Sequence, residues 1–180
     1  MRQALQSFRS GELWLADVAP PSAAPRGARI ETTVSLVSAG TEKMILELGR
    51  KSLVGKARAR PDLVRRVLQK ARQEGFRQTF EQVTQRLAAP LPLGYAAAGV
   101  VKDVQDAPGL VPGMRVAAAG MGYASHAEMI WVPRNLIVPI PDGVSDEEGC
   151  SATVGAIALL GVRLAEPRLG DRIVVIGLGL

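Results

Sequence analysis

Two glycines near the C-terminal end of the sequence have the spacing of a turn that binds nucleotide phosphates. Gly177 and Gly179, with Leu178 between them, directly follow residues 173–176, which read Ile-Val-Val-Ile. An uninterrupted β-branched run is typical of a strand buried on both faces of a parallel sheet. After such a strand, the first glycine permits a tight bend and the second lets a pyrophosphate approach the backbone. We therefore predict that Gly177, Leu178 and Gly179 contact a dinucleotide cofactor.

The pattern is short, and an ordinary strand followed by a flexible turn fits the same residues equally well. The third glycine of the nucleotide-binding fingerprint would lie just beyond Leu180. A parallel strand also needs neighbouring strands joined by crossover connections. We therefore expect a truncated protein, with a front domain over residues 1–168 and the start of a nucleotide-binding domain over residues 169–180.

The positive charge of the chain is concentrated in one segment. The net charge is +5, but residues 43–90 hold twelve lysines and arginines against four acids. Nucleic acid or another anionic surface would fit this segment, although we favour the solvated face of an inserted helical lobe. We expect no aromatic side chain among the exposed arginines, because Phe76 and Phe80 fall on an apolar stripe.

A change of hydrophobic period divides the front of the chain. Residues 28–37 alternate and predict a strand, with Ile30, Val34 and Leu36 on one face. Residues 43–87 change to helical spacing, with two apolar stripes that we expect to pack together. The stripes are formed by Leu63, Val64, Val67, Leu68 and Ala71, and by Phe76, Phe80, Val83 and Leu87.

Short strands return after residue 90 and are separated by Gly and Pro turns, which indicates a small β-barrel. Ser145 and Glu148 have the spacing of a capping box at the start of a short helix. Residues 151–166 are apolar almost all round, and this pattern predicts a helix buried between two bodies.

The composition, 47% apolar and 22% charged, is that of a globular protein. No stretch approaches the roughly 18 apolar residues of a membrane span. Residues 1–9 lack the apolar core of a secretory signal. One cysteine, Cys150, excludes an internal disulfide and a zinc site of four thiolates. We therefore expect a cytoplasmic protein.

Several motifs follow one another in order: Ser-Ala-Gly-Thr-Glu at residues 38–42, Pro-Leu-Gly-Tyr at 92–95, Pro-Gly-Met-Arg-Val at 112–116 and Val-Val-Ile-Gly-Leu-Gly at 174–179. This series resembles the medium-chain dehydrogenase/reductase superfamily, and most closely the front half of bacterial bi-domain oxidoreductases. The resemblance implies a mostly β fold with α elements. It consists of a GroES-like barrel with a helical insert over residues 43–90, followed by the first strand of a Rossmann α/β domain.

The resemblance also implies an enzyme that uses NAD or NADP and transfers a hydride to or from a carbonyl, an alcohol or an activated alkene. Zinc-dependent members hold their metal with a Cys, a His and a third Cys or Glu. Here Ala39 and Tyr95 occupy the first two ligand positions, and only Cys150 lies near the third. We therefore expect no zinc. The substrate oxygen would instead need hydrogen-bond donors or a general acid.

Three hydroxyl residues occupy functional positions in the resemblance. Thr41 corresponds to the residue that relays protons, Tyr95 replaces a metal ligand, and Thr153 lies where the family approaches the nicotinamide. We predict that Thr41 and Tyr95 are catalytic and that Thr153 contacts the cofactor; alternatively, Tyr95 fills the vacated metal cavity and Thr41 caps a helix. We interpret His126 as a residue of the barrel surface, and Cys150 as a buried side chain without an activating partner.

Two functions fit these observations. The first is a zinc-independent NAD(P)-dependent oxidoreductase, of which this chain is the catalytic domain and would be inactive alone. The second is a non-catalytic module whose basic insert docks an acidic partner or nucleic acid. We expect a small-molecule substrate, and the bi-domain resemblance suggests a sugar derivative. For the first function we expect neither nucleic acid nor a membrane as a partner, and we allow for a homo-oligomer of the full-length protein.

Overall fold

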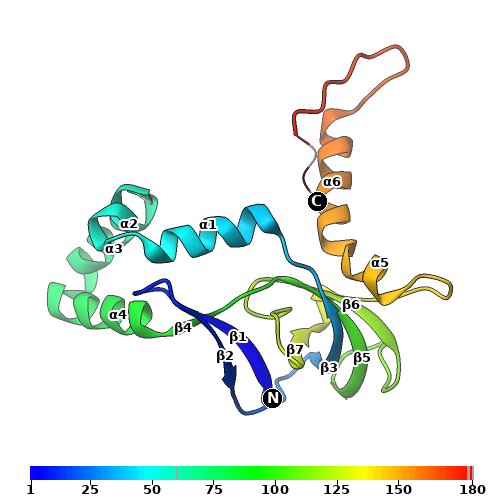
Figure 1. The fold of residues 1–180 in the computed structure, drawn as a ribbon, viewed down its shortest axis with the longest axis horizontal. Coiled ribbons are helices and arrows are strands. Elements are labelled where there is room, and N and C mark those ends of the chain that lie inside the picture. Colours follow the sequence, from blue (N-terminus) through cyan, green and yellow to red (C-terminus); the bar gives the residue numbers. More distant parts are fainter. Residues whose placement is uncertain (60, 178, 180) are drawn as a thin grey trace.

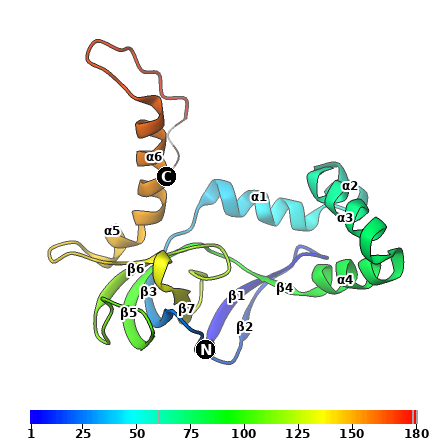
Figure 2. The same cartoon turned by 180° about the vertical axis from the view of Figure 1, so that it is seen from behind.

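The computed structural model describes residues 1–59, 61–177 and 179 of the chain. Within this part, two antiparallel β-sheets lie between a helical lobe and a helix that projects away from the sheets (Figure 1). The view from behind shows the lobe and the projecting helix at opposite ends of the molecule (Figure 2). The fold is therefore mixed α/β, and the GroES-like form of the barrel stays a prediction.

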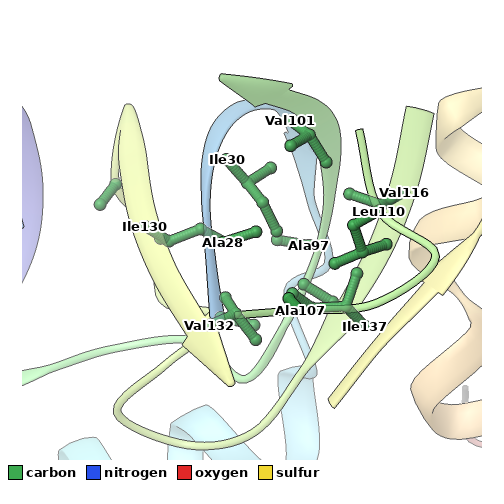
Figure 3. Packing of buried hydrophobic residues seen from close by; sticks show 13 residues of the cluster. Ala28, Ile30, Ala97, Val101, Ala107, Leu110, Val116, Ile130, Val132 and Ile137 are labelled. Atoms are coloured by element: carbon green, nitrogen blue, oxygen red, sulfur yellow. The ribbon is translucent and has the colours of Figure 1, made fainter. Parts of the chain in front are cut away.

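The larger sheet holds the main core of the protein. Its strands run antiparallel in the order β7-β3-β5-β6-β8, and a short 3-10 helix, η1 (Arg134–Leu136), leads into the last of them. Small and β-branched side chains from these strands and their loops fill the buried cluster in Figure 3. The five strands are β3 (Gly27–Ser35), β5 (Ala96–Gln105), β6 (Arg115–Ala119), β7 (Met129–Pro133) and β8 (Ile137–Pro139).

Strand β3 is confirmed, but the prediction that Ile30, Val34 and Leu36 share one face is wrong. Thr32 pairs with Gly99 and Val34 with Ala98, so the register shifts between them. Ile30 consequently belongs to the main core, whereas Val34 and Leu36 pack against a second cluster on Cys150. An extra residue in one strand turns the following side chains to the other face.

The smaller sheet connects the N-terminus with the end of the helical lobe. Its strands are β2 (Leu13–Asp17), β1 (Arg2–Ser7) and β4 (Pro90–Pro92), in that order. It is joined to the rest of the molecule by a hydrogen bond of 2.9 Å from the backbone N–H of Ala4 to the carbonyl oxygen of His126.

Four helices form the predicted helical lobe: α1 (Ala39–Arg50), α2 (Leu53–Ala59), α3 (Pro61–Glu74) and α4 (Phe76–Ala88). The lobe begins a few residues before the predicted residue 43, because Ser38 caps α1. Lys56 is buried where α2 meets the β1–β2 turn, and its Nζ donates to the carbonyl oxygen of Phe8 at 2.6 Å. Burial lowers the pKa of this ammonium group.

The predicted apolar stripes of the lobe are only partly buried. Ala71 of α3 is buried, but Leu68 is exposed, and Phe76 and Phe80 of α4 are each 73% exposed. The side chains of Leu63 and Leu87 lie outside the described residues. The interpretation of both phenylalanines as buried residues is therefore wrong, because no other described side chains cover this part of α4.

The C-terminal elements begin with a confirmed capping box. The Ser145 hydroxyl accepts from the N–H of Glu148, and the Glu148 carboxylate accepts from the N–H of Ser145, at the start of α5 (Asp146–Cys150). Asp146 then ties this helix to the sheet. Its carboxylate accepts from the Thr33 hydroxyl at 2.6 Å and from the Arg115 guanidinium at 2.6 and 2.8 Å.

Helix α6 (Ala152–Ala165) forms as predicted, but it is not buried between two bodies. Thr153 and Val154 are half-buried at its start, and residues 155–165 are all exposed. The predicted strand at residues 173–176 is not formed in this structure, where these residues are irregular and exposed, and their place in a nucleotide-binding sheet stays a prediction. No strand of the described part lies beside them to complete a backbone ladder. Among the described helices, none is both long and apolar enough to cross a bilayer.

The substitution Asp146→Asn should destabilise the protein. The hydrogen bond from Thr33 and the neighbouring Arg115 hold the pKa of Asp146 below its usual value. Its stabilising contribution is therefore present above the unfolded pKa of about 4 and is lost as the pH falls through the lower folded pKa. At pH near 7, urea unfolding should show that Asp146→Asn lowers the free energy of unfolding by roughly 1.5–3 kcal/mol.

The matched control is Glu147→Gln, because Glu147 is an exposed acid in the same helical turn. Its effect should stay within about 0.5 kcal/mol. The difference in the free energy of unfolding between the wild type and Asp146→Asn should narrow at acidic pH. A difference that stays constant would show that Thr33 and Arg115 do not stabilise the ionised Asp146 carboxylate.

Candidate functional site

Thr41 is half-buried in the first turn of α1. Ser38 is the N-cap residue, and its hydroxyl accepts from the N–H of Thr41 at 3.4 Å. The Glu42 carboxylate accepts from the N–H of Ser38 at 3.1 Å. The helix is therefore capped by Ser38 and Glu42, which corrects the alternative that Thr41 serves as the cap. The half-buried hydroxyl of Thr41 is not used for capping.

A chain of three polar side chains lies directly behind Thr41. The Nε2 of His126 is 3.1 Å from Glu42 Oε1, and its Nδ1 is 2.8 Å from Ser35 Oγ. The side chains of His126 and Glu42 are only 15% and 10% exposed. A neutral His126 protonated on Nε2 donates a hydrogen bond to Glu42 and accepts one from the Ser35 hydroxyl. An imidazolium donates a hydrogen bond to both residues. This His126 network joins β3, α1 and the loop before β7.

The backbone before Tyr95 packs against the same imidazole. Gly94 has a φ of +93°, and a Cβ placed on it would lie 2.8 Å from the backbone nitrogen of His126 and 2.9 Å from the Nδ1 of its ring. The N–H of His126 donates to the carbonyl oxygen of Leu93 at 2.7 Å. On the other side, the carbonyl oxygen of Tyr95 accepts from the N–H of Gly120 at 2.8 Å. The position of Tyr95 is therefore fixed from both sides.

The two residues predicted to be catalytic, Thr41 and Tyr95, both adjoin in sequence a residue that contacts His126. Thr41 directly precedes Glu42, and Tyr95 directly follows Gly94, so each is one residue from a group that contacts His126. The interpretation of His126 as a barrel-surface residue is wrong, because its ring is enclosed and bonded at both nitrogens. The roles of Thr41 and Tyr95 in catalysis stay predictions.

Sequence reasoning missed His126, Glu42 and Ser35 as a group. The available signal was that His126 is the single histidine of the chain, within a motif-rich segment. Glu42 also stands four residues after the N-cap Ser38, where its carboxylate can reach back to the helix start. The pairing itself depends on tertiary contacts between residues more than 80 positions apart.

Cys150 is the last residue of α5 and lies against strands β3 and β5. Its thiol donates weakly to the carbonyl oxygens of Ala96 at 3.6 Å and Val34 at 3.8 Å. Burial raises the pKa of this thiol, and the residue is 2% exposed. The interpretation of Cys150 as a buried side chain is confirmed. A protonated, enclosed thiol is a poor nucleophile.

The residues at this place do not fit a zinc ion. Ala39 has no ligand atom, Cys150 holds a thiol that burial keeps protonated, and His126 and Glu42 are bonded to each other. Within the described part of the chain, no group of three or more His, Cys, Asp or Glu side chains is arranged to hold a metal. Zinc requires three or four protein ligands.

The residues predicted to bind a cofactor are not gathered into one site. Thr153 is half-buried at the first turn of α6, next to Cys150. Gly177 and Gly179 are exposed, in a segment that turns back along α6 (Figures 1 and 2). Leu178 lies outside the described residues. The contacts of these residues with a cofactor stay predictions.

An open, mainly apolar groove begins beside the His126 network. It has a volume of about 430 Å³ and follows one face of α1. Glu42 contributes to both the groove and the network. The lining residues are Leu13, Val37, Ala39, Glu42, Lys43, Leu46, Glu47 and Arg50. The groove is large enough for a small organic molecule, and its lining includes Glu42 but neither Thr41 nor Tyr95.

Solved structures share this fold. A probable oxidoreductase from Mycobacterium abscessus has a TM-score of 0.63 and 19% identity, over 95% of this chain and 45% of its own. The quinone oxidoreductase from Thermus thermophilus, which was also solved in complex with NADPH, has a TM-score of 0.60 and 20% identity, and the match covers 95% of this chain and 43% of that one. The quinone oxidoreductase from Coxiella burnetii has a TM-score of 0.64 and 17% identity, and the match covers 95% of this chain and 47% of that one.

These neighbours are described as oxidoreductases, and the shared fold supports the resemblance noted in the sequence at the level of the fold. The chain spans less than half the length of each of them. No family model matches the sequence, and no curated protein matches it. The comparisons consequently establish a shared fold and leave substrate and reaction to be argued from the site.

The substitution Gly94→Ala should destabilise the contact between the Tyr95 segment and His126. An alanine there adopts an unfavourable positive φ, and its methyl group collides with the backbone and ring of His126. Thermal or urea unfolding should show a loss of about 2–4 kcal/mol.

Gly113→Ala is the matched control, since Gly113 has a φ of +86° but no atom within 4 Å of its added Cβ. This substitution should lower the free energy of unfolding by only about 1 kcal/mol, because alanine is unfavourable at a positive φ. Equal losses in the two variants would mean that Gly94 and His126 are not in close contact.

Proposed function

We propose that this chain is the substrate-binding and catalytic part of a zinc-independent oxidoreductase that uses NAD or NADP. The observation that carries the proposal is that Thr41 and Tyr95 each directly adjoin, in sequence, a residue that contacts the buried His126: Glu42 and Gly94, respectively. The shared fold with quinone oxidoreductases supports it. The side chains of Ala39 and Cys150 support zinc independence, because they offer no adequate ligand set.

A reduced nicotinamide supplies a hydride to an electrophilic carbon of a carbonyl or an activated alkene. The chain's own task is then to stabilise the negative charge that develops on the substrate oxygen. In this proposal the phenol of Tyr95 donates a hydrogen bond to that oxygen, and the Thr41 hydroxyl passes on a proton. The groove along α1 holds the rest of a small substrate. The bi-domain resemblance favours a sugar derivative, whereas the apolar groove lining favours a less polar one.

The cofactor would lie on the side of the molecule occupied by α6. Thr153 is half-buried at the start of that helix, and the exposed apolar residues of α6 need a covering layer. A nucleotide-binding sheet that includes residues 173–176 would supply this layer and order the turn at Gly177 and Gly179. The proposal therefore assigns the cofactor's phosphates to that turn and the nicotinamide to the neighbourhood of Thr153.

The natural gene product that contains this chain should oxidise NADPH or NADH in the presence of a quinone, an aldehyde or a sugar-derived carbonyl. Tyr95→Phe should lower kcat by about 100-fold, because one donor to the substrate oxygen is lost. Thr41→Val should lower it by about tenfold or more. Reduced-nicotinamide absorbance measures both rates.

Tyr123→Phe provides the control, since Tyr123 is the other tyrosine of the chain and is exposed. Its rate should equal that of the wild type. Full activity of Tyr95→Phe would exclude the role proposed for Tyr95, and stoichiometric zinc in elemental analysis of the active protein would overturn zinc independence.

A further inference from the structure

The first two turns of α4 expose two aromatic side chains to solvent. Phe76 and Phe80 are separated by one helical turn, so they lie on the same side of the helix. The preceding helix, α3, exposes Leu68 by 53% and Val67 by 38%. The helical lobe thus presents large apolar side chains at the end of the molecule farthest from α6 (Figures 1 and 2).

Exposed cations share the face of α3 that carries Leu68. On α3, Arg65 and Arg72 stand three residues before and four residues after Leu68, so all three share one face. Arg66 is also exposed. Among the side chains that the structure describes, no ion pair involves Arg65, Arg66 or Arg72. The surface is therefore both apolar and positively charged.

This combination narrows the kind of partner. A second copy of the lobe would bring two strongly positive segments together, which opposes self-association. Nucleic acid would suit the arginines, but protein–nucleic-acid interfaces are polar, and aliphatic side chains such as Leu68 and Val67 gain little there. A helix of another protein would need an apolar groove. The described groove follows α1 and includes neither phenylalanine.

We propose that α3 and α4 form a docking surface for an anionic phospholipid bilayer. In this arrangement Phe76, Phe80 and Leu68 enter the boundary between headgroups and acyl chains, while Arg65 and Arg72 remain at the level of the lipid phosphates. In this proposal the protein is held at the membrane surface by these side chains. The proposal departs from the sequence-based expectation of no membrane partner, which considered only a membrane-spanning segment.

Vesicle co-sedimentation of the wild-type protein tests the proposal. Vesicles of phosphatidylcholine with about one-third phosphatidylserine should bind the protein, and binding should decline steeply as salt rises. Vesicles of phosphatidylcholine alone should bind it at least about tenfold more weakly. Removing either component of the surface should also weaken binding to the anionic vesicles. Phe76→Ser with Phe80→Ser, and Arg65→Gln with Arg72→Gln, should each reduce the affinity about tenfold or more.

Two matched pairs keep the test specific. Val111→Ser with Val138→Ser removes apolar side chains elsewhere that are also more than half exposed, and Arg163→Gln with Arg172→Gln removes exposed cations outside the lobe. Both control pairs should bind vesicles like the wild type. Thermal unfolding of the phenylalanine pair should be close to that of the wild type, because exposed side chains contribute little to stability.

Several results would overturn the proposal. These are no binding to anionic vesicles at low salt, equal effects of the lobe variants and their controls, or a large loss of stability in the phenylalanine pair, which would place Phe76 and Phe80 inside a protein interface. Tight binding of a single-stranded oligonucleotide without vesicle binding would assign the surface to nucleic acid. Tight binding of polyglutamate without vesicle binding would assign it to an acidic protein.

Discussion

The imidazole of His126 is the contact on which the candidate site depends. It bonds Ser35 through one nitrogen and Glu42 through the other, and it packs against Gly94. Three segments that are distant in sequence therefore meet at one buried side chain. Breaking such a network leaves buried polar groups without partners, which costs more than an average hydrogen bond contributes. The network consequently holds the start of α1, and with it Thr41, in a fixed position relative to the segment of Tyr95.

The end of β3 supplies the anchors for this arrangement. Three successive residues each bind a different part of the molecule: Thr33 donates to Asp146, the carbonyl oxygen of Val34 accepts from Cys150, and Ser35 bonds His126. The register shift between Thr32 and Val34 leaves Thr33 without a paired residue on β5. The end of β3 therefore couples α5, which leads toward the predicted cofactor side, to the His126 network beside the predicted substrate side.

The sequence was sufficient for features that depend on local patterns. The capping box at Ser145 and Glu148, the helical lobe and most of the antiparallel strands follow from spacing and turn residues. Features that depend on tertiary contacts with distant parts of the chain were not predictable from these local patterns. Helical spacing identifies an apolar stripe but not its cover, so Phe76 and Phe80 were expected to be buried. The bulge at Thr33 has no glycine or proline to reveal it, and the pairing of His126 with Glu42 exists only after folding.

The most direct test of the central claim is a double-mutant cycle between Glu42 and His126. Glu42→Met and His126→Phe preserve much of the size of each side chain and remove its polar atoms. The separate bond from Ser38 to Glu42 is lost in both backgrounds and cancels in the cycle. Urea unfolding of the wild type, the two single variants and the double variant should give a coupling free energy of about 1 kcal/mol or more. Effects that add to within about 0.3 kcal/mol would contradict the account.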